Sequence, residues 1–398
     1  MSKYELLAPA GDLEKLKIAI LYGANAVFIG GQKFSLRSRA SNFTIEDIKE
    51  GCKFAHEHNA KIHVTCNIVM HNIDTDGLIE YLKELENAGV DCIIASSLYI
   101  LKMVLKHTKM EAHVSTQAST SNHLAVNAYE QIGVNRVVLA RELSLDEIKK
   151  VRDNSKCDIE AFIHGGMCVS ISGRCMLSNN MTNRDANRGG CAHSCRWCYD
   201  LYDDGKIINP AGDYFAMSSK DLCAIKHIKD LMDIGVNSFK IEGRMKSLHY
   251  IATVVNAYRK IIDEYETTGK IIDINKYEKM IARAENRLTS IGFLEGMTTI
   301  NEQLYDLNLT LPTQEFIGIV LDYDEKSSMA TVEQRNYFTP NSTIEVFSPT
   351  ETFNIEIKEI YDNDLNILDA ARHPRQIIKF KSLKKLNPYD LLRLIWLI

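Results

Sequence analysis

Short apolar runs alternate with amphipathic segments over the first 266 residues of the chain. The apolar runs have the length of strands that are buried on both faces, and the segments that follow have the apolar period of helices. The predicted strands are residues 6–10, 26–30, 61–67, 91–96, 111–116, 136–140, 158–164 and 238–242. The predicted helices are residues 13–22, 44–58, 77–88, 98–106, 123–132, 144–151, 220–233 and 248–266. Asp12, Thr44 and Ser144 stand at helix starts, where a short polar side chain caps free backbone N–H groups.

Eight strand–helix units in succession predict an α/β fold, a (β/α)8 TIM-like barrel. A doubly wound open sheet is the alternative, but no Gly-rich dinucleotide fingerprint follows the first strand. In a barrel, the residues that carry chemistry lie at the carboxyl ends of the strands. We therefore expect the functional residues directly after each predicted strand.

The pattern changes after residue 270. A further helix is predicted at 275–288, and a less regular stretch runs on through residue 312. From residue 316, short alternating segments separated by turns predict strands. The sequence thus predicts a barrel at 1–270, a helical linker at 271–312 and a small C-terminal all-β domain, barrel-like, at 313–398.

Composition and charge exclude some classes of protein. Hydrophobic residues make up 45% and charged residues 25%, which is usual for a globular protein. The net charge of −5 excludes a chain that is cationic throughout. Six cations between Arg372 and Lys385 form either a solvated face or a contact for RNA phosphates. No apolar run reaches membrane-spanning length and no signal-peptide pattern opens the chain, so we expect a soluble cytoplasmic protein.

Five of the ten cysteines lie between residues 167 and 199, with the spacing C-x6-C-x15-C-x3-C-x2-C. Gly and Asn are frequent in this segment and no regular period is visible, so we predict an irregular loop. It follows the seventh predicted strand, which places it across the mouth of the barrel. We call residues 167–199 the cysteine loop.

The cysteine loop has four possible explanations. Unliganded core cysteines do not usually crowd in this way, and disulfides are disfavoured in a cytoplasmic protein. Zinc sites are usually built from two close C-x2-4-C pairs, whereas only residues 191–198 are close-set here. The irregular spacing therefore favours an iron–sulfur cluster, with zinc as the main rival.

Polar residues follow several predicted strands and would share one rim of the barrel. Each of them alone is more often an ordinary loop residue. Together they form a candidate site: Asn67, Gln117, Arg141, Glu142, His164, Glu242 and Arg244. Arg141 and Arg244 follow the sixth and eighth strands, and two guanidinium groups there could bind carboxylates or phosphates in bidentate fashion.

Several segments resemble peptidase family U32, the collagenase-like proteases. They are ELLAPAGDLEKLKIAILYGANAVFIGG, HVSTQAS, EAFIHGGMCVSISGRCMLS, CAHSCRWCYDL and SFKIEGRMKSLHYIATVVNAYRKIID. The resemblance covers residues 1–270 closely and the C-terminal part more loosely. It implies the cluster ligands by position: Cys168, Cys175, Cys191 and Cys195 would hold one [4Fe–4S] cluster, with Cys198 and Cys223 as reserves. Cys52, Cys66, Cys92 and Cys157 fall in predicted barrel elements and are expected to be dispensable for the cluster.

The resemblance is strongest to the branch of the family that hydroxylates tRNA without dioxygen. It implies formation of 5-hydroxyuridine at the wobble position, dependence on prephenate as a small dicarboxylate donor, and possible pairing with a related subunit. The candidate catalytic residues are then Gln117, Arg141, His164, Glu242 and Arg244. Two other functions stay open: a U32 peptidase, for which His164 and Cys168 would be the nearest candidates, and a non-catalytic RNA-binding partner subunit.

Overall fold

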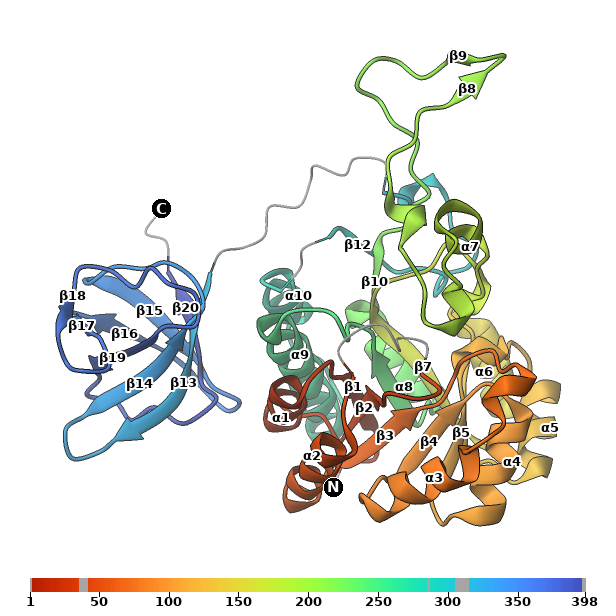
Figure 1. Cartoon of the computed structure of the whole chain (residues 1–398), viewed down its shortest axis with the longest axis horizontal. Coiled ribbons are helices and arrows are strands. Elements are labelled where there is room, and N and C mark those ends of the chain that lie inside the picture. Colours follow the sequence, from red (N-terminus) through yellow and green to blue (C-terminus); the bar gives the residue numbers. More distant parts are fainter. Residues whose placement is uncertain (1, 36–41, 285–286, 305–314, 396–398) are drawn as a thin grey trace. The chain divides into compact units, whose positions relative to one another are not determined.

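The computed structural model describes residues 2–35, 42–284, 287–304 and 315–395. The chain divides into two compact units, Met1–Thr310 and Leu311–Ile398. Figure 1 shows the elements of both units along the chain.

The first unit contains a closed barrel of parallel strands with helices around it (Figure 1). Its last strand pairs in parallel with both the first and the seventh, which closes the sheet and confirms the predicted (β/α)8 barrel. The strands are β1 (Glu5–Pro9), β2 (Ala26–Gly30), β3 (Lys61–Thr65), β4 (Cys92–Ala95), β5 (Glu111–Val114), β6 (Arg136–Val138), β7 (Asp158–Gly165) and β11 (Ser238–Ile241). The surrounding helices are α1 (Leu13–Leu21), α2 (Ile45–Glu57), α3 (Leu78–Asn87), α4 (Leu98–His107), α5 (His123–Ile132), α6 (Leu145–Asp153), α8 (Ile228–Ile234) and α9 (Leu248–Thr268).

Local sequence signals explain how several of these helices begin. The side chain of Asp12 accepts a hydrogen bond from the backbone N–H of Lys15, as an N-cap residue should. Thr44 and Ser144 each form a complete capping box at the start of α2 and α6. The caps predicted from sequence are therefore confirmed.

The segment predicted as one helix at 220–233 is different in the structure. Residues Asp221–Cys223 form strand β10, which is antiparallel to β7, and only Ile228–Ile234 form the α-helix α8. The single-helix prediction was wrong because Leu222 and Cys223 pair with Gly165 and His164, residues distant in sequence. A strand that forms through such long-range pairing need not show an alternating apolar pattern in its own sequence.

Residues 271–304, which the sequence suggested as part of a linker, belong to the first unit where they are described. Helix α10 (Ile274–Ala282) packs against α9, and β12 (Thr289–Ser290) pairs in parallel with β10. The predicted helix at 275–288 therefore ends early, and residues 285–286 of it lie outside the described part of the chain. None of the described helices is long and apolar enough to cross a membrane.

Charged side chains form a hydrogen-bonded network inside the barrel. Lys240 donates to Glu160 Oε1 at 2.8 Å, and Ser238 donates to Glu160 Oε2 at 3.0 Å. Arg136 donates to Glu160 Oε2 at 3.3 Å and also to Glu5. Glu160 is fully buried, so its charge needs these partners. The network connects β1, β6, β7 and β11 across the interior of the barrel.

The second unit is an antiparallel β domain with the spatial order β16-β15-β20-β13-β14-β19-β17-β18. The strands are β13 (Phe316–Asp324), β14 (Met329–Gln334), β15 (Ser342–Phe347), β16 (Thr352–Ile357), β17 (Ile360–Tyr361), β18 (Ile367–Leu368), β19 (Ile377–Lys381) and β20 (Leu391–Leu394). Alternate residues such as Ala330, Val332, Ile378 and Phe380 form its buried core. The predicted all-β domain is confirmed.

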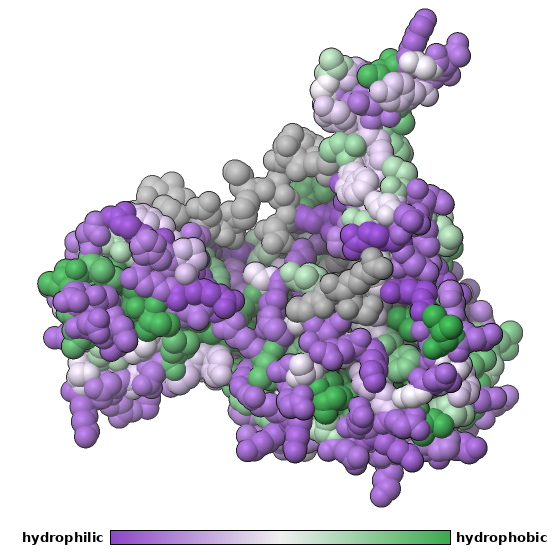
Figure 2. Space-filling model, in the orientation of Figure 1, coloured by the Kyte–Doolittle hydropathy of each residue, from purple (hydrophilic) through white to green (hydrophobic). Residues whose placement is uncertain are grey.

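The face of the molecule drawn in Figure 2 is mostly hydrophilic, with apolar residues scattered over it. Single exposed apolar side chains are usual on folded proteins and need no special explanation.

Candidate active site at the mouth of the barrel

A cavity of about 160 Å³ opens at the carboxyl ends of the barrel strands. Six of the seven polar residues that the sequence singled out line it: Asn67, Gln117, Arg141, Glu142, Glu242 and Arg244. Lys240 also lines it, and so does Cys168 at the start of the cysteine loop. The cavity thus combines guanidinium, ammonium, carboxylate and thiol groups in one small space.

Arg141 is fixed against the wall of the cavity. Its Nη1 donates to the carbonyl oxygen of Gly166 at 2.6 Å, and its Nη2 lies 3.7 Å from Oε2 of Glu242. Its guanidinium carbon lies 3.7 Å from the centre of the Phe162 ring. Cation–π attraction to the ring adds to these contacts, and Nε of Arg141 has no hydrogen-bond partner among the described residues.

Arg244 is almost fully buried and donates to the side-chain oxygen of Asn42. Its side chain passes directly over Gly30, at the end of β2. A Cβ atom at residue 30 would stand 2.8 Å from Cζ of Arg244, which is closer than real contacts allow. The absence of a side chain at Gly30 therefore makes the room in which this guanidinium lies.

Glu142 and Gln117 join the rim of the barrel to the cysteine loop. Oε1 of Glu142 accepts a hydrogen bond from the backbone N–H of Ser172 at 2.8 Å. Gln117 stands against Gly173, since a Cβ atom there would be 3.6 Å from its Nε2. Glu142 and Gln117, which both follow predicted strands, thus contact the cysteine loop and also line the cavity.

His164 is not brought together with the other candidates. It is almost fully buried, and it is not among the described residues that line the cavity. Its Nδ1 lies 3.4 Å from the hydroxyl of Tyr258, and its ring packs against Tyr250 and Tyr258. Burial lowers the pKa of His164 to about 4, so the imidazole is neutral near pH 7.

The cysteine loop contains more regular structure than its composition indicated. Helix α7 (Leu177–Thr182) and 3₁₀ turns at Ile171–Gly173, Ala186–Arg188 and Ser194–Arg196 interrupt it. Asn187 stabilises the loop from inside, because its side-chain amide donates to the carbonyl oxygen of Cys175 at 3.1 Å. Most of the segment is still irregular, as predicted.

An ion pair attaches the loop to the segment that follows β3. Nη2 of Arg188 donates to Oδ1 of Asp74 at 2.8 Å, and Nη1 donates to the second carboxylate oxygen. The backbone joins in, since Val69 N–H donates to the carbonyl oxygen of Asn187 at 3.0 Å. The bond to Arg188 is the main reason that the pKa of Asp74 falls to about 2. A bidentate pair of this kind fixes the orientation of the two side chains as well as holding them together.

Two of the four cysteines that the resemblance implied as ligands, Cys168 and Cys195, lie close enough to the others for the pKa of each to be affected by them. Burial is the main cause that raises the pKa of Cys168, and Cys175 and Cys191 raise it further. Burial likewise raises the pKa of Cys195, followed by the influence of Cys168, Cys191 and Cys175. All four are free cysteines, so their sulfur atoms are available as ligands.

The number and type of donors in the loop can be compared with what each metal group needs. One tetrahedral Zn²⁺ draws its sulfur ligands to within ~2.3 Å of the metal, whereas a [4Fe–4S] cluster spreads four thiolates over a larger body. Within the described ranges, the four loop cysteines are not grouped within 4.8 Å of one another. Four thiols are the number that a [4Fe–4S] cluster uses, so this donor set is compatible with the cluster.

The remaining cysteines have other surroundings. Cys198 is exposed, and it is not among the groups that shift the pKa of Cys168 or Cys195. Cys223 lies on β10 beside Tyr258; burial and then this thiol raise the pKa of the phenol well above its ordinary value. Burial raises the pKa of Cys52 and Cys66 to about 12 and that of Cys157 to about 11, so these remain unreactive thiols.

Lys240 is a charged cavity residue that was not predicted from the sequence. It lies in the middle of a buried strand, where its Nζ stands 4.6 Å from the centre of the Phe28 ring. One signal was present in the sequence: Lys240 is two residues before Glu242 in the predicted strand 238–242, and residues two apart on a strand are expected on the same side. Lys240 was not predicted because only residues at the carboxyl ends of the predicted strands were considered as site residues.

Comparison with known proteins identifies the family. The model of peptidase family U32 matches residues 11–304, and that of the U32 C-terminal domain matches residues 312–393. The chain belongs to peptidase family U32. Within the family, it is 49% identical to tRNA hydroxylation protein P1 of Bacillus subtilis over 98% of this chain and 94% of that protein.

Two further relatives match a large share of this chain. The tRNA hydroxylation protein P of Escherichia coli is 33% identical over 90% of this chain and 89% of its own length. The 23S rRNA 5-hydroxycytidine C2501 synthase of Escherichia coli is 38% identical over 66% of this chain and 39% of its own length. All three of these relatives are thus named for hydroxylation of RNA.

Proposed function

We propose that this protein hydroxylates tRNA, forming 5-hydroxyuridine at the wobble position with an iron–sulfur cluster and without dioxygen. The observation that carries the proposal is that Cys168 lines the same cavity as Arg141 and Arg244. A proposed cluster ligand and two guanidinium groups, which can bind anions, thus line one cavity. The names of the relatives support RNA as the substrate.

The cluster would be held by Cys168, Cys175, Cys191 and Cys195. When bound, a [4Fe–4S] cluster supplies electron transfer and, where an iron has an open position, Lewis acidity. The loop's contribution is orientation: Glu142 holds Ser172, and Arg188 fixes the far side of the loop to Asp74. In this proposal, these contacts hold the loop in the position in which Cys168 lines the cavity.

Arg141 and Arg244 would bind the small carboxylated donor, for which prephenate is the candidate. A dicarboxylate presents two planar acceptors, and each matches the fork of one guanidinium. Lys240 lies below them and adds positive potential to the floor of the cavity, although Glu160 binds part of its charge. Glu242, 3.7 Å from Arg141, orients that arginine.

The reaction sets a requirement on the donor. Replacing the hydrogen at C5 of uracil by a hydroxyl group oxidises the base by two electrons. The species that gives up the oxygen atom must accept the same two electrons. A cavity of about 160 Å³ is small, so base and donor would have to meet at its opening, with the base splayed from a single-stranded loop.

The test uses cells that lack every route to 5-hydroxyuridine, complemented with this chain alone. Mass spectrometry of tRNA nucleosides should show 5-hydroxyuridine derivatives under anaerobic growth, and not in cells that cannot make prephenate. Arg244→Ala should abolish the product, whereas the surface control Lys149→Ala should not. Anaerobically purified protein should be brown, with broad absorbance near ~400 nm.

The same experiment separates the other two functions. A peptidase would leave tRNA nucleosides unchanged and would cleave protein substrates after purification. A non-catalytic partner subunit would bind tRNA and restore the product only in the presence of a second protein. Product formation by this chain alone, as the only family member in the cell, excludes the partner function.

A further inference from the structure

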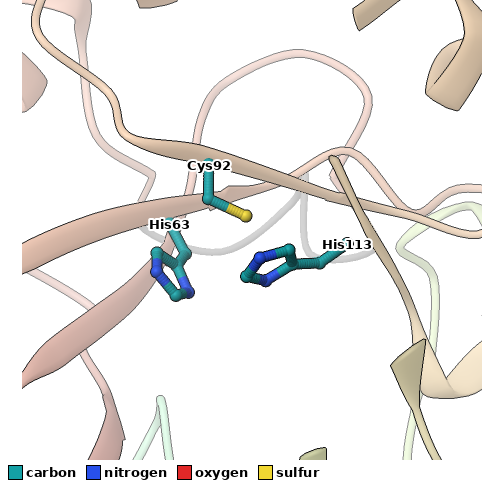
Figure 3. Close-up of side chains that lie close together, drawn as sticks. All are labelled: His63, Cys92 and His113. Atoms are coloured by element: carbon teal, nitrogen blue, oxygen red, sulfur yellow. The ribbon is translucent and has the colours of Figure 1, made fainter. Parts of the chain in front are cut away.

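A second group of metal-binding residues lies inside the barrel, one layer below the cavity. We propose that His63, Cys92 and His113 bind one Zn²⁺ ion that links strands β3, β4 and β5. Ligand atoms of the three side chains lie within 4.8 Å of one another. Figure 3 shows the three side chains pointing toward one another from their strands. The inference does not depend on the proposed function.

The strand register produces this cluster. His63 of β3 pairs with Cys92 of β4, and His113 of β5 pairs with Ile94, two residues further along β4. Residues two apart on a strand face the same side. Thr65, Ile94 and Ser115 follow the three donors by two residues each, and all three line the cavity at the mouth. The proposed ion would therefore lie directly beneath that cavity and apart from the cysteine loop.

The histidine nitrogens give an independent reason to expect a ligand. His63 and His113 are fully buried. Neither nitrogen of His63, nor Nδ1 of His113, has a hydrogen-bond partner among the described residues. A buried polar atom without a hydrogen-bond partner destabilises the folded state by about 1–3 kcal/mol. Three such atoms close together are therefore unusual in a protein core. A metal ion at their centre would bind one nitrogen of His63 and Nδ1 of His113, and so would give two of these three atoms a partner.

A second layer of contacts holds one ligand in place. Nε2 of His113 lies 3.0 Å from Oε2 of Glu111, which leaves Nδ1 for the metal. Lys61 donates in turn to Oε1 of Glu111 at 2.9 Å. A carboxylate on the outer nitrogen is the usual way in which proteins orient a metal-bound imidazole. The two rings are perpendicular, with centroids 5.2 Å apart, so they do not stack on each other.

The donor set indicates which ion is bound. Two imidazoles and a thiolate suit Zn²⁺, with a fourth position left for water or another oxygen ligand. Binding replaces the thiol proton of Cys92, which leaves to solvent, and no electron transfer is involved. Because the site is enclosed, the ion would enter as the barrel folds and would stabilise the folded state.

Metal analysis of the whole chain tests the site, provided that zinc in the cysteine loop is excluded. We would change Cys168, Cys175, Cys191 and Cys195 to Ser together and express this loop variant with zinc in the medium. It should retain about one zinc per chain. Adding Cys92→Ser or His63→Gln should reduce the zinc content at least tenfold. Adding Cys157→Ser, a buried cysteine outside the group, should leave it unchanged.

X-ray absorption at the zinc edge identifies the zinc ligands without the need for these variants. Zinc in the wild-type chain should show one sulfur ligand and imidazole scattering, whereas zinc in the cysteine loop would show several sulfurs. A folded loop variant without zinc would overturn the proposal. So would zinc content that Cys92→Ser and His63→Gln leave unchanged, or copper or iron in its place.

Discussion

Gly30 and Arg244 occupy the same space at the end of strand β2. A Cβ atom at residue 30 would overlap the guanidinium of Arg244, and it would also stand 2.7 Å from Oγ of Ser35. The position of one proposed donor-binding arginine is thus set by the absence of a side chain on a different strand. This relationship gives a way to move Arg244 without removing its charge.

We predict that Gly30→Ala reduces hydroxylation nearly as much as Arg244→Ala. The added methyl group forces the guanidinium away from the cavity, and a displacement of about 1 Å can cost roughly 100-fold in rate. Activity should be measured per bound cluster, so that loss of iron is separated from loss of donor binding.

A double variant provides the control for Gly30→Ala. If the methyl group acts through Arg244, adding Gly30→Ala to Arg244→Ala should cause little further loss, because the two changes remove one interaction. Fully additive losses would show that residue 30 acts elsewhere, for example through Ser35.

The ion pair between Arg188 and Asp74 should affect how tightly the cysteine loop binds the proposed cluster. Arg188→Ala and Asp74→Asn each release the loop from the segment after β3, so iron should be lost to a chelator several-fold faster. The pair is partly exposed, so the effect on overall stability should be about 1 kcal/mol or less. Arg184→Ala is the matched control, since this arginine lies in the same loop and forms no ion pair with a described residue. Equal iron loss in all three variants would contradict the role of the pair.

Cys195 and Cys198 are three residues apart but should respond differently to substitution. Cys195 lies among the other three proposed ligands, whereas Cys198 is exposed and outside their mutual influence. Cys195→Ser should therefore remove most of the roughly four irons per chain, and Cys198→Ser should leave them. Iron content and absorbance near ~400 nm provide the measurement. If Cys198→Ser removes the iron and Cys195→Ser does not, then Cys198 is the ligand and Cys195 is not.

The barrel could be predicted because its strands and helices carry local signals, such as the caps at Asp12 and Thr44. The barrel topology then located much of the cavity, since Gln117, Arg141 and Arg244 come directly after predicted strands. Local signals failed at 221–223, where the strand exists only because β7 and β12 lie beside it.

His164 and the histidine–cysteine group show a second limit. His164 was expected at the rim because the predicted strand ended there. In the structure β7 continues to Gly165, and the imidazole of His164 packs against Tyr258. His63, Cys92 and His113 are separated by 29 and 21 residues, so no motif marks them. Only the register of β3, β4 and β5 brings them together.

The cations near the end of the chain should not contribute equally to tRNA binding. Lys384 and Lys385 form ion pairs with Glu351 and Glu325. Arg375 and Lys381 are exposed and form no ion pair with any described residue. Residues 313–398 carry ten Lys and Arg against thirteen Asp and Glu, so unpaired cations matter most for contact with phosphates.

We therefore predict that the double variant Arg375→Gln, Lys381→Gln weakens tRNA binding and lowers its salt dependence more than Lys384→Gln, Lys385→Gln does. Affinity measured at several salt concentrations tests this, because removing one cation that binds a phosphate reduces the slope by roughly one. If both double variants bind like the wild type, the run between Arg372 and Lys385 is solvated surface.

The stability of the barrel should depend on pH through Glu160. Burial alone would raise the pKa of this carboxyl group, but Lys240 and Arg136 outweigh it and lower the pKa from 4.5 to about 2. Because the pKa is lower in the folded state, the ionised group stabilises the fold fully above about pH 4.5. This stabilisation is lost as the pH falls toward 2. Glu160→Gln should cost about 3–5 kcal/mol at pH 7, since it leaves Lys240 buried without its partner.

Urea unfolding of wild type and Glu160→Gln at pH 7, 5 and 3 gives the measurement, and the difference between them should shrink at the lowest pH. The control is Glu50→Gln, which removes an exposed ion pair with Lys17 and should cost no more than about 1 kcal/mol. A difference that stays constant down to pH 3 would mean that packing of the side chain, rather than its charge, is what Glu160 contributes.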